Sequence, residues 1–300
     1  MSARQVLFYL GALLLFGAGW GLTMPLTKIA VSTGYQHFGL LFWQMAIGFL
    51  TMSLIGLARG KGLPLSRSAL WVYFAIAMIG SVVPNSFSYQ AAVHLPSGVL
   101  SILLSMIPMF AFPMALALGL DRFELRRFGG LVAGLFGVSL IVLPNLQLGS
   151  AIPVIWVGIA LISGLCYAFE GNYVARWGTA GLDPVEVLWG ASLVGMIITF
   201  PLAIGAGQWI TPLQPYGQPE WAHIASSVIH VLVYTGYVWL VNAAGPVFAV
   251  MISYLVTVTG VFWARAILDE SYPPTVWAAL ALMLIGMALV QPRRLQRAVP

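Results

Sequence analysis

PSGVLSILLSMIP, residues 96–108, opens the stretch of sequence that decides the fold. The stretch continues through a short charged bend, Asp121 to Arg127, into an apolar run that ends at Pro144. Two long apolar runs on either side of a charged bend predict two helices that form a hairpin. This hairpin occurs twice in the chain, and its second copy lies 149 residues later.

The second copy begins at Pro246, has its own charged bend and ends at Pro292. Aligning the two bends places Asp121 over Glu270, and a glycine follows each of these acidic residues after 16 positions. A helical hairpin repeated at half the chain length predicts a duplicated fold. We therefore divide the chain into two repeats, residues 1–149 and 150–300.

The composition indicates an integral membrane protein. Of the 300 residues, 60% are hydrophobic and 7% are charged, against about 25% charged in an ordinary soluble domain. The net charge of +5 comes from basic residues in short bends, which is no sign of nucleic-acid binding. The single cysteine, Cys166, excludes an internal disulfide and a zinc cluster, and we expect it to be a packing residue. The first apolar run has no cleavage site, so we interpret it as a transmembrane helix.

Ten segments are long and apolar enough for a membrane-spanning helix, which needs about 20 such residues. The chain is therefore predicted to be an all-α polytopic membrane protein. The two very short connections, around Leu95 and around Gly245, predict antiparallel neighbours. The ten segments are 6–30, 38–58, 69–93, 96–119, 126–145, 153–177, 184–205, 221–243, 246–267 and 274–291.

The basic residues predict the orientation. If the N-terminus is cytoplasmic and all ten helices cross, only Lys28 and Arg265 of the 13 basic residues lie on the far side. This asymmetry follows the positive-inside rule and places both termini in the cytoplasm. Because five helices per repeat is an odd number, the second repeat enters the membrane in the opposite sense. Inverted repeats of this kind occur in secondary transporters, where the substrate site lies near the midplane between the repeats.

Polar residues recur at helical spacing in five of the segments. Such residues are costly in lipid, so we expect them to face a cavity or another helix. The second, fifth, seventh and tenth segments have few polar residues. The stripes are Ser81, Asn85, Ser88 and Tyr89; Ser97, Ser101 and Ser105; Ser163, Tyr167, Glu170 and Tyr173; His223, Ser227, His230, Tyr234 and Tyr237; and Ala249, Ser253 and Thr257.

Several of these features have a structural alternative. Serines four residues apart also allow close helix packing. Pro108 predicts a kink, which could be structural or a hinge for alternating access. Gly130 and Gly134 could pack inside the protomer or form a homodimer contact. A position at the membrane interface suffices to explain the aromatic residues Trp71, Tyr73, Trp221 and Trp277.

Glu170 is the only acidic residue well inside a predicted helix, where an ionised side chain costs at least ~2.5–3.5 kcal/mol. One interpretation is a structural ion pair with His230 or Lys28. The other is that Glu170 faces the cavity and binds a substrate ammonium or a proton.

The sequence resembles the drug/metabolite transporter superfamily, in its EamA-domain branch, and within that branch the YddG-type bacterial amino-acid exporters. The resemblance implies a ten-helix carrier in the bacterial inner (cell) membrane, with a central cavity lined by the first four helices of each repeat. Trp20 and Pro108 have no counterpart in the second repeat. The residues that carry the resemblance are Trp20, Gly21, Lys28, Pro108, Asp121, Gly130 and Gly137 in the first repeat, and Arg176, Glu270 and Gly286 in the second.

We therefore expect a secondary transporter that exports small metabolites, above all neutral and aromatic amino acids, by alternating access. Hydroxyls and amides suit the α-amino and α-carboxyl groups, and aromatic rings suit stacking and cation–π contacts. We expect no cofactor, metal or nucleic acid to take part. The predicted substrate-binding residues are Trp20, Asn85, Ser88, Tyr89, Ser101, Ser105, Tyr167, Glu170, His230, Tyr234, Tyr237, Ser253 and Thr257, with Pro108 as a hinge.

Three other functions remain as alternatives, and the first is the export of another small metabolite or a drug. Among such solutes we rank sugar nucleotides and phosphate esters low. Sugar nucleotides and phosphate esters usually require basic residues in the site, and Lys28 is the one candidate. An enzyme is disfavoured because the chain lacks an H-E-x-x-H zinc motif and a G-x-S-x-G elbow, and its four histidines are scattered. A channel or a purely structural membrane protein is the third alternative.

Overall fold

The computed structural model describes residues 3–145, 154–244 and 251–290, and these form helices joined by short connections. The predicted connection around Gly245 and Pro246, together with Ala249 and the C-terminal arginines Arg293, Arg294 and Arg297, lies outside the described residues. The first repeat contains α1 (Ala3–Ala30), α2 (His37–Ala58), α3 (Arg67–Ile76), α4 (Val83–His94), α5 (Ser97–Leu104), α6 (Ile107–Ala117) and α7 (Leu125–Val142). The second contains α8 (Val154–Trp177), α9 (Pro184–Gly205), α10 (Gln218–Ala244), α12 (Ile252–Leu268) and α13 (Pro274–Val290).

These helices occupy the ten predicted segments. Eight spans are long and apolar enough to cross a membrane, and α12 and α13, of 17 residues each, are shorter apolar helices. Within the described ranges there is no strand. The prediction of an all-helical, polytopic, two-repeat membrane protein is therefore confirmed.

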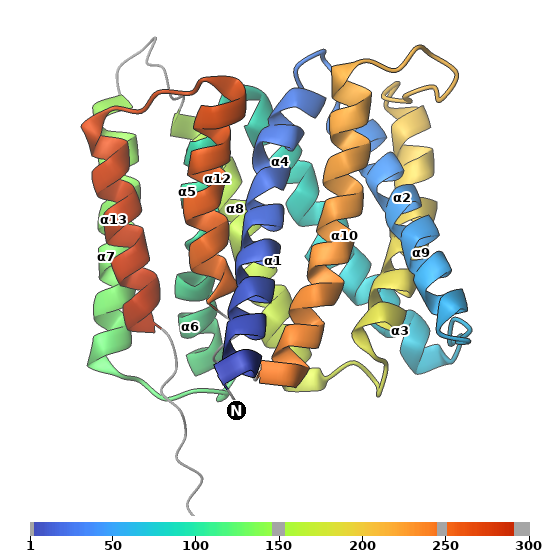
Figure 1. Ribbon diagram of the computed structural model, residues 1–300, viewed down its shortest axis with the longest axis horizontal. Coiled ribbons are helices and arrows are strands. Elements are labelled where there is room, and N and C mark those ends of the chain that lie inside the picture. Colours follow the sequence, from blue (N-terminus) through green and yellow to red (C-terminus); the bar gives the residue numbers. More distant parts are fainter. Residues whose placement is uncertain (1–2, 146–153, 245–250, 291–300) are drawn as a thin grey trace, which may run out of the picture.

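The two repeats run in opposite directions through the molecule. In Figure 1, α1 rises from the N-terminus, whereas α8, the first helix of the second repeat, starts at the opposite side and descends. The last helix, α13, ends on the side where α1 begins. Both ends of the described chain therefore lie on one side, as the distribution of basic residues predicts.

The helix packing has the symmetry that a duplicated fold requires. The pair α1 and α10 has its counterpart in α8 and α4, and the pair α1 and α12 in α8 with α5 and α6. The pairs α2 with α9, and α7 with α13, each join the same helix of the two repeats. An exchange of the repeats thus maps these main packed pairs onto one another, which is expected for a two-fold axis between them.

The fifth helices of the repeats, α7 and α13, stand side by side at one end of the molecule (Figure 1). A Cβ at Gly130 would lie 2.7 Å from the Gly286 carbonyl oxygen, and one at Gly134 would lie 1.9 Å from the Met109 sulfur. Both glycines are buried within the chain. The geometry therefore matches the packing interpretation of Gly130 and Gly134, and the homodimer stays a prediction.

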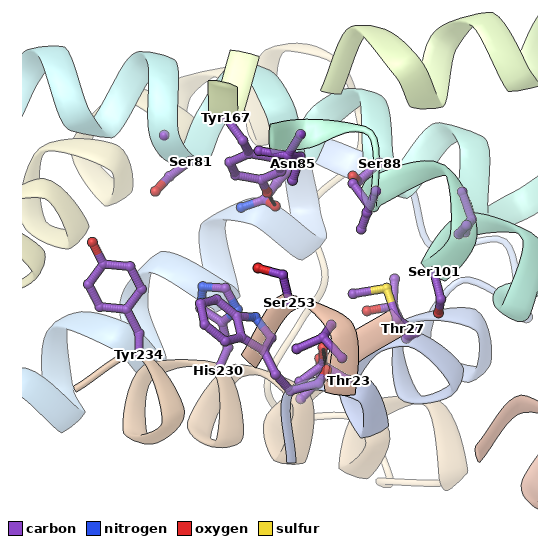
Figure 2. Close-up of a pocket in the computed structure, with 18 of the residues that line it drawn as sticks. Thr23, Thr27, Ser81, Asn85, Ser88, Ser101, Tyr167, His230, Tyr234 and Ser253 are labelled. Carbon is purple, nitrogen blue, oxygen red and sulfur yellow. Dashed lines mark hydrogen bonds between the residues drawn. The ribbon is translucent and has the colours of Figure 1, made fainter. Parts of the chain in front are cut away.

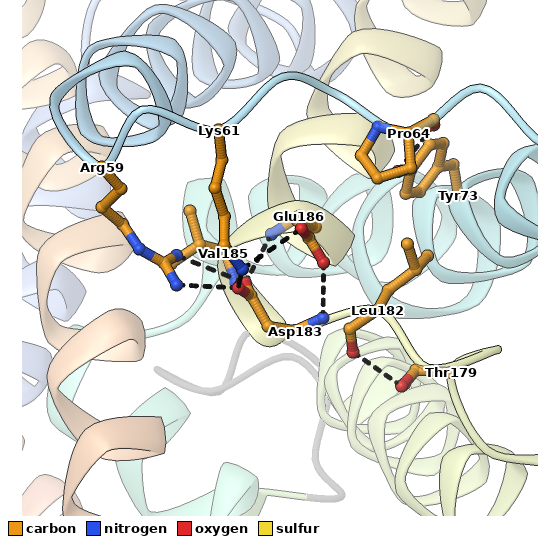
Figure 3. Close-up of polar contacts among 9 residues, drawn as sticks. All are labelled: Arg59, Lys61, Pro64, Tyr73, Thr179, Leu182, Asp183, Val185 and Glu186. Atoms are coloured by element: carbon orange, nitrogen blue, oxygen red, sulfur yellow. Dashed lines mark hydrogen bonds and ion pairs between the residues drawn. The ribbon is translucent and has the colours of Figure 1, made fainter.

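At the other end, α2 packs against α9, and ion pairs join the two helices on the side of the N-terminus (Figure 3). Asp183, the N-cap of α9, accepts hydrogen bonds from Arg59 at 2.8 Å and Lys61 at 2.7 Å. Burial by itself raises the pKa of Asp183, but these hydrogen bonds outweigh it and hold the pKa well below its usual range. The cluster fixes the connection after α2 to the start of α9.

Tyr73 corrects one interpretation. We expected a ring at the membrane interface, but the Tyr73 side chain is 1% exposed and packs directly on Gly190 of α9. Its hydroxyl donates a hydrogen bond to the Pro64 carbonyl at 3.0 Å (Figure 3). Trp71, Trp221 and Trp277 are exposed, as expected of interfacial residues.

Two helices of the first repeat are interrupted. A π-helical segment, Ala77–Val82, joins α3 to α4 within one span. The fourth span is divided at Ser105 and Met106 into α5 and α6, and Pro108 stands in the first turn of α6. The kink predicted from Pro108 is therefore present, although it begins three residues earlier. Both interruptions lie beside the cavity described below.

Candidate functional site

A cavity of about 400 Å³ lies between the two repeats. Its volume is near the lower end of the range for small-molecule sites. Residues from α1, α2, α3, α4, α5, α6, α8, α9, α10 and α12 and from the π-helical segment line it. The fifth helices, α7 and α13, contribute no lining residue.

The predicted binding residues meet in this cavity. All thirteen of them line it, and so does Pro108. Figure 2 shows Ser81, Asn85, Ser88 and Tyr167 along one wall, facing His230, Tyr234 and Thr23, with Ser253 between the walls. The two walls are built by α4 with α8 and by α1 with α10, the helix pairs that the two-fold axis exchanges. That these residues bind a substrate stays a prediction.

One wall is aromatic. The Trp20 ring lies edge-to-face with His230 at 5.6 Å between ring centres, and with Tyr234 and Tyr237 at 6.1 Å each. These are favourable separations for aromatic pairs, so the cluster is a preformed surface. It can accept a flat apolar group or the positive charge of a cation over a ring face.

The opposite wall is polar, and hydrogen bonds fix its side chains. The Tyr167 hydroxyl donates to Asn85 Oδ1 at 2.5 Å, and the Tyr89 hydroxyl donates to Gln44 Oε1 at 2.9 Å. Ser88 shares a hydrogen bond of 2.8 Å with Ser163, which lies behind it. Because Tyr167 uses the Asn85 oxygen, the Asn85 amide NH₂ group remains available as a donor.

Glu170 lies at the junction of these walls, next to the π-helical segment. A Cβ at Gly80 would lie 2.3 Å from Glu170 Oε1, so the carboxyl group in its present position packs directly on this glycine. Within the described ranges, the Glu170 side chain has no hydrogen bond or ion pair. The expected structural partner Lys28 is bound elsewhere, to the carbonyls of Ala92 at 2.7 Å and Leu95 at 3.0 Å. The geometry therefore favours a carboxylate that serves the cavity.

Ser101 of α5 and Ser105, which follows this helix, fit both interpretations of their stripe, namely helix packing and a position facing the cavity. Ser101 and Ser105 line the cavity, yet their hydroxyls donate to the carbonyls of Ser97 and Ile102, at 3.2 and 2.6 Å. Ser101 also touches Gly260 of α12, where a Cβ would lie 2.3 Å from its hydroxyl oxygen. These hydroxyls can accept a hydrogen bond from a solute but are committed as donors.

Some cavity residues were not predicted. Thr23 and Thr27 follow Trp20 at spacings of three and seven, which is the same helix face and could have identified them. Gln44 lies in the second segment, which has few polar residues, and it lines the cavity and accepts a hydrogen bond from Tyr89. Ser226, not the predicted Ser227, lines the cavity.

Other residues of the predicted stripes lie away from the central cavity. Ser97 is in the first turn of α5, Ser163 is buried behind Ser88, and Tyr173 packs against Val72 and Val187. His223 instead lines a smaller pocket of about 190 Å³ between α2 and α10.

The charge of the lining limits the solutes it suits. Glu170 is the one carboxylate among the lining residues, and His230 is the one titratable nitrogen. Neither a lysine nor an arginine is among the described residues that line the cavity. In the described part of the chain, no three His, Cys, Asp or Glu side chains are grouped as a metal site would require. The arrangement is suited to binding a neutral, zwitterionic or cationic solute.

Comparisons with known proteins agree with this architecture. A model of the EamA-like transporter family matches residues 7–143 and again residues 154–291. The predicted division at residues 149 and 150 falls between the two matches. A crystal structure of a protein shares the fold, with a TM-score of 0.62 over 96% of both chains at 18% identity. The comparison with curated proteins found no match.

Proposed function

The chain belongs to the EamA-like transporter family, and we propose that this membrane transporter of small molecules exports neutral and aromatic amino acids. It does so by alternating access through the central cavity, and it resides in the bacterial cell membrane. The observation that carries the proposal is the lining itself. Among the described residues, one carboxylate without a protein partner faces hydroxyl, amide and aromatic groups, and no lysine or arginine lines the same space.

Each part of an amino acid has a complementary group in the cavity. The α-ammonium is a donor of three hydrogen bonds, and Glu170 is the anionic acceptor for it. The α-carboxylate needs donors, which the Asn85 amide supplies on the polar wall. An aromatic or apolar side chain fits the cluster of Trp20, Tyr234 and Tyr237.

The same lining argues against anionic cargo. A phosphate ester or a sugar nucleotide would place its charge beside Glu170 without a lysine or arginine to neutralise it. Lys28, which follows the lining residue Thr27, is bound to backbone carbonyls. We therefore rank such substrates below amino acids and small amines.

Counterflow into liposomes tests this proposal. Purified protein is reconstituted in vesicles loaded with unlabelled phenylalanine, and entry of labelled phenylalanine is measured with and without a proton gradient. We expect saturable, transient accumulation, which a channel cannot produce. Phenylalanine methyl ester should compete because it keeps the ammonium, whereas N-acetylphenylalanine should not.

The analogues make the outcome specific. Competition by N-acetylphenylalanine equal to that of phenylalanine would remove the role given to Glu170. Absence of counterflow for every neutral and aromatic amino acid, with exchange of another solute class, would contradict the proposed substrate.

A further inference from the structure

The connection between α4 and α5, residues 95–96, is held at both of its helix ends. It lies on the side of the molecule opposite the N-terminus, where α4 ends and α5 begins (Figure 1). The last carbonyls of a helix carry partial negative charge and the first N–H groups partial positive charge, and both lack partners within the helix. Here a cation binds the first set and an anion binds the second.

Lys28 is the cation. Its Nζ donates hydrogen bonds to the carbonyls of Ala92 at 2.7 Å, Val93 at 3.1 Å and Leu95 at 3.0 Å. All three carbonyls are at the end of α4 or just beyond it. The ammonium group therefore uses its three donors on this one helix terminus, and it ties the end of α1 to the end of α4.

Glu270 is the anion, and it comes from the other repeat. The backbone N–H groups of Ser97 and Gly98 donate to its Oε1 and Oε2, at 2.7 and 3.1 Å. The Tyr272 hydroxyl also donates to Oε2. Burial and this hydrogen bond raise the pKa of Tyr272, so its hydroxyl stays a donor at physiological pH. A Cβ at Gly98 would lie 2.1 Å from the Tyr272 oxygen, so glycine is required there.

These contacts adjoin the cavity. Thr27 precedes Lys28 and lines the cavity, and Leu100 and Ser101 line it one turn after Ser97. Three helices also converge closely here: a Cβ at Gly21 of α1 would lie 2.8 Å from the backbone nitrogen of Gly260 in α12, which itself touches Ser101 of α5. A path for a solute between these helices would require α5 to separate from α1 or α12.

The corresponding residues on the side of the N-terminus are engaged differently. Asp121, which the repeat alignment places over Glu270, is paired with Arg127 within its own repeat. Arg176, which stands near the end of α8 as Lys28 does in α1, lies over the ring of its neighbour Trp177 at 5.9 Å. The carboxylate of Glu270 thus binds a helix N-terminus of the other repeat, whereas the ion pair of Asp121 lies within its own repeat.

We propose that Glu270, Tyr272 and Lys28 form a latch that closes the cavity on the side opposite the N-terminus and must release the α4–α5 connection for solute to pass there. The latch rests on the proposed carrier function, because only a protein that opens to its two sides in turn needs to release this connection. Glu270 and Tyr272 link the repeats, whereas Lys28 holds the connection within the first repeat.

Distance measurements between spin labels test the latch. One label replaces Val93, whose side chain is 48% exposed, and the other replaces the exposed Ser271. Both are introduced into a Cys166→Ala background, since Cys166 is the only native cysteine. The parent is expected to give one short, narrow distance distribution in the absence of solute.

Glu270→Gln is the decisive variant. Glutamine keeps one acceptor oxygen but loses the charge, so one of the two backbone N–H groups loses its acceptor. We expect the ratio of long to short distances to rise about tenfold, corresponding to about 1.4 kcal/mol. The matched control is Asp269→Asn, an exposed acidic neighbour outside the latch, whose left-handed backbone (φ 54°) asparagine tolerates.

The outcomes separate cleanly. An unchanged distribution in Glu270→Gln, or an equal change in Asp269→Asn, would overturn the latch. If Glu270→Gln does not fold, Tyr272→Phe removes one hydrogen bond only, and it must shift the distances in the same direction for the latch to stand. If the distances change in Glu270→Gln but the parent shows no counterflow, the latch stands and the proposed function is rejected. If the parent shows counterflow but the distances do not change in Glu270→Gln, the proposed function stands and the latch is rejected.

Discussion

Replacing Glu170 with glutamine removes the one acidic charge of the cavity and leaves the size of the side chain almost unchanged. The carboxyl group touches the backbone at Gly80 and, within the described ranges, receives no hydrogen bond. The substitution therefore mainly changes the interactions of residue 170 with a bound solute. We expect solute affinity to fall and the stability of the protein to stay the same or rise.

The expected loss of affinity follows from hydrogen-bond strengths. An ammonium at about 4 Å from a carboxylate interacts by about 4 kcal/mol at an effective dielectric constant of 20, and desolvation offsets part of this. Hydrogen bonds to a charged group contribute about 1.5–3 kcal/mol net, against about 0.5–1.5 kcal/mol for neutral pairs. A difference of about 1.4 kcal/mol is tenfold in the dissociation constant.

The expected effect on stability has the other sign. An ionised side chain inside the membrane costs at least ~2.5 kcal/mol, so neutralising a carboxylate without a partner should maintain or raise the melting temperature. A structural ion pair would predict the reverse, because breaking it leaves an unpaired buried charge. The two interpretations of Glu170 therefore differ in a quantity that needs no transport assay.

The assay is binding of phenylalanine and of its methyl ester to purified protein, by calorimetry, with thermal unfolding of the same samples. We expect Glu170→Gln to raise both dissociation constants about tenfold and to unfold at the same or a higher temperature. Glu124→Gln, the same change in the bend before α7, is the matched control. An unchanged dissociation constant together with a lower melting temperature would refute the reasoning.

Three further predictions concern the scaffold. Gly190→Ala should destabilise the protein by about 1–3 kcal/mol, because its Cβ would lie 2.3 Å from the Tyr73 ring; thermal unfolding beside Gly205→Ala, which has open space in the same helix, measures this. Asp121→Asn should cost about 1–3 kcal/mol, because Arg127, 5% exposed, loses its charged partner; an unfolding curve that overlays that of the parent would contradict it. The carboxyl of Asp183 has a lowered pKa, so its stabilisation is complete above pH ~5 and declines as the pH falls below ~4, the pKa of an unfolded aspartate. The difference in melting temperature between the parent and Asp183→Asn should therefore shrink between pH 5 and pH 3, and a difference that grows on acidification would show the opposite sign.

Sequence reasoning succeeds here where the membrane restricts the possible structures. Polar side chains are costly in lipid, so a polar stripe is expected to face the protein interior. An example is the stripe of His230, Tyr234 and Tyr237. The odd number of helices per repeat then turns the second repeat over and brings its stripes to face those of the first (Figure 1). Two general constraints thus place all thirteen predicted residues around one cavity.

The features that sequence reasoning missed depend on contacts between distant segments. Gln44 lies in a largely apolar helix and belongs to no polar stripe. Its hydrogen bond with Tyr89 becomes evident only when the packing of α2 is known. Gly80 in the π-helical segment makes room for Glu170 of the other repeat. The alignment of the two bends pairs Glu270 with Asp121, but the hydrogen bonds of Glu270 to Ser97 and Gly98 cross between the repeats, and local spacing contains no signal for them.

The central claim is that the transported solute occupies the cavity between α1, α4, α8 and α10. Protection of a cavity cysteine tests it most directly. Ser253→Cys in the Cys166→Ala background places one thiol between the two walls (Figure 2), and its rate of modification by a small thiol reagent is measured with and without phenylalanine. Thr33→Cys, at an exposed position beyond α1, is the control. We expect phenylalanine to slow modification at position 253 in a saturable manner and to leave position 33 unaffected. Equal modification rates at position 253 with and without saturating phenylalanine, in a protein that shows counterflow of it, would contradict the claim.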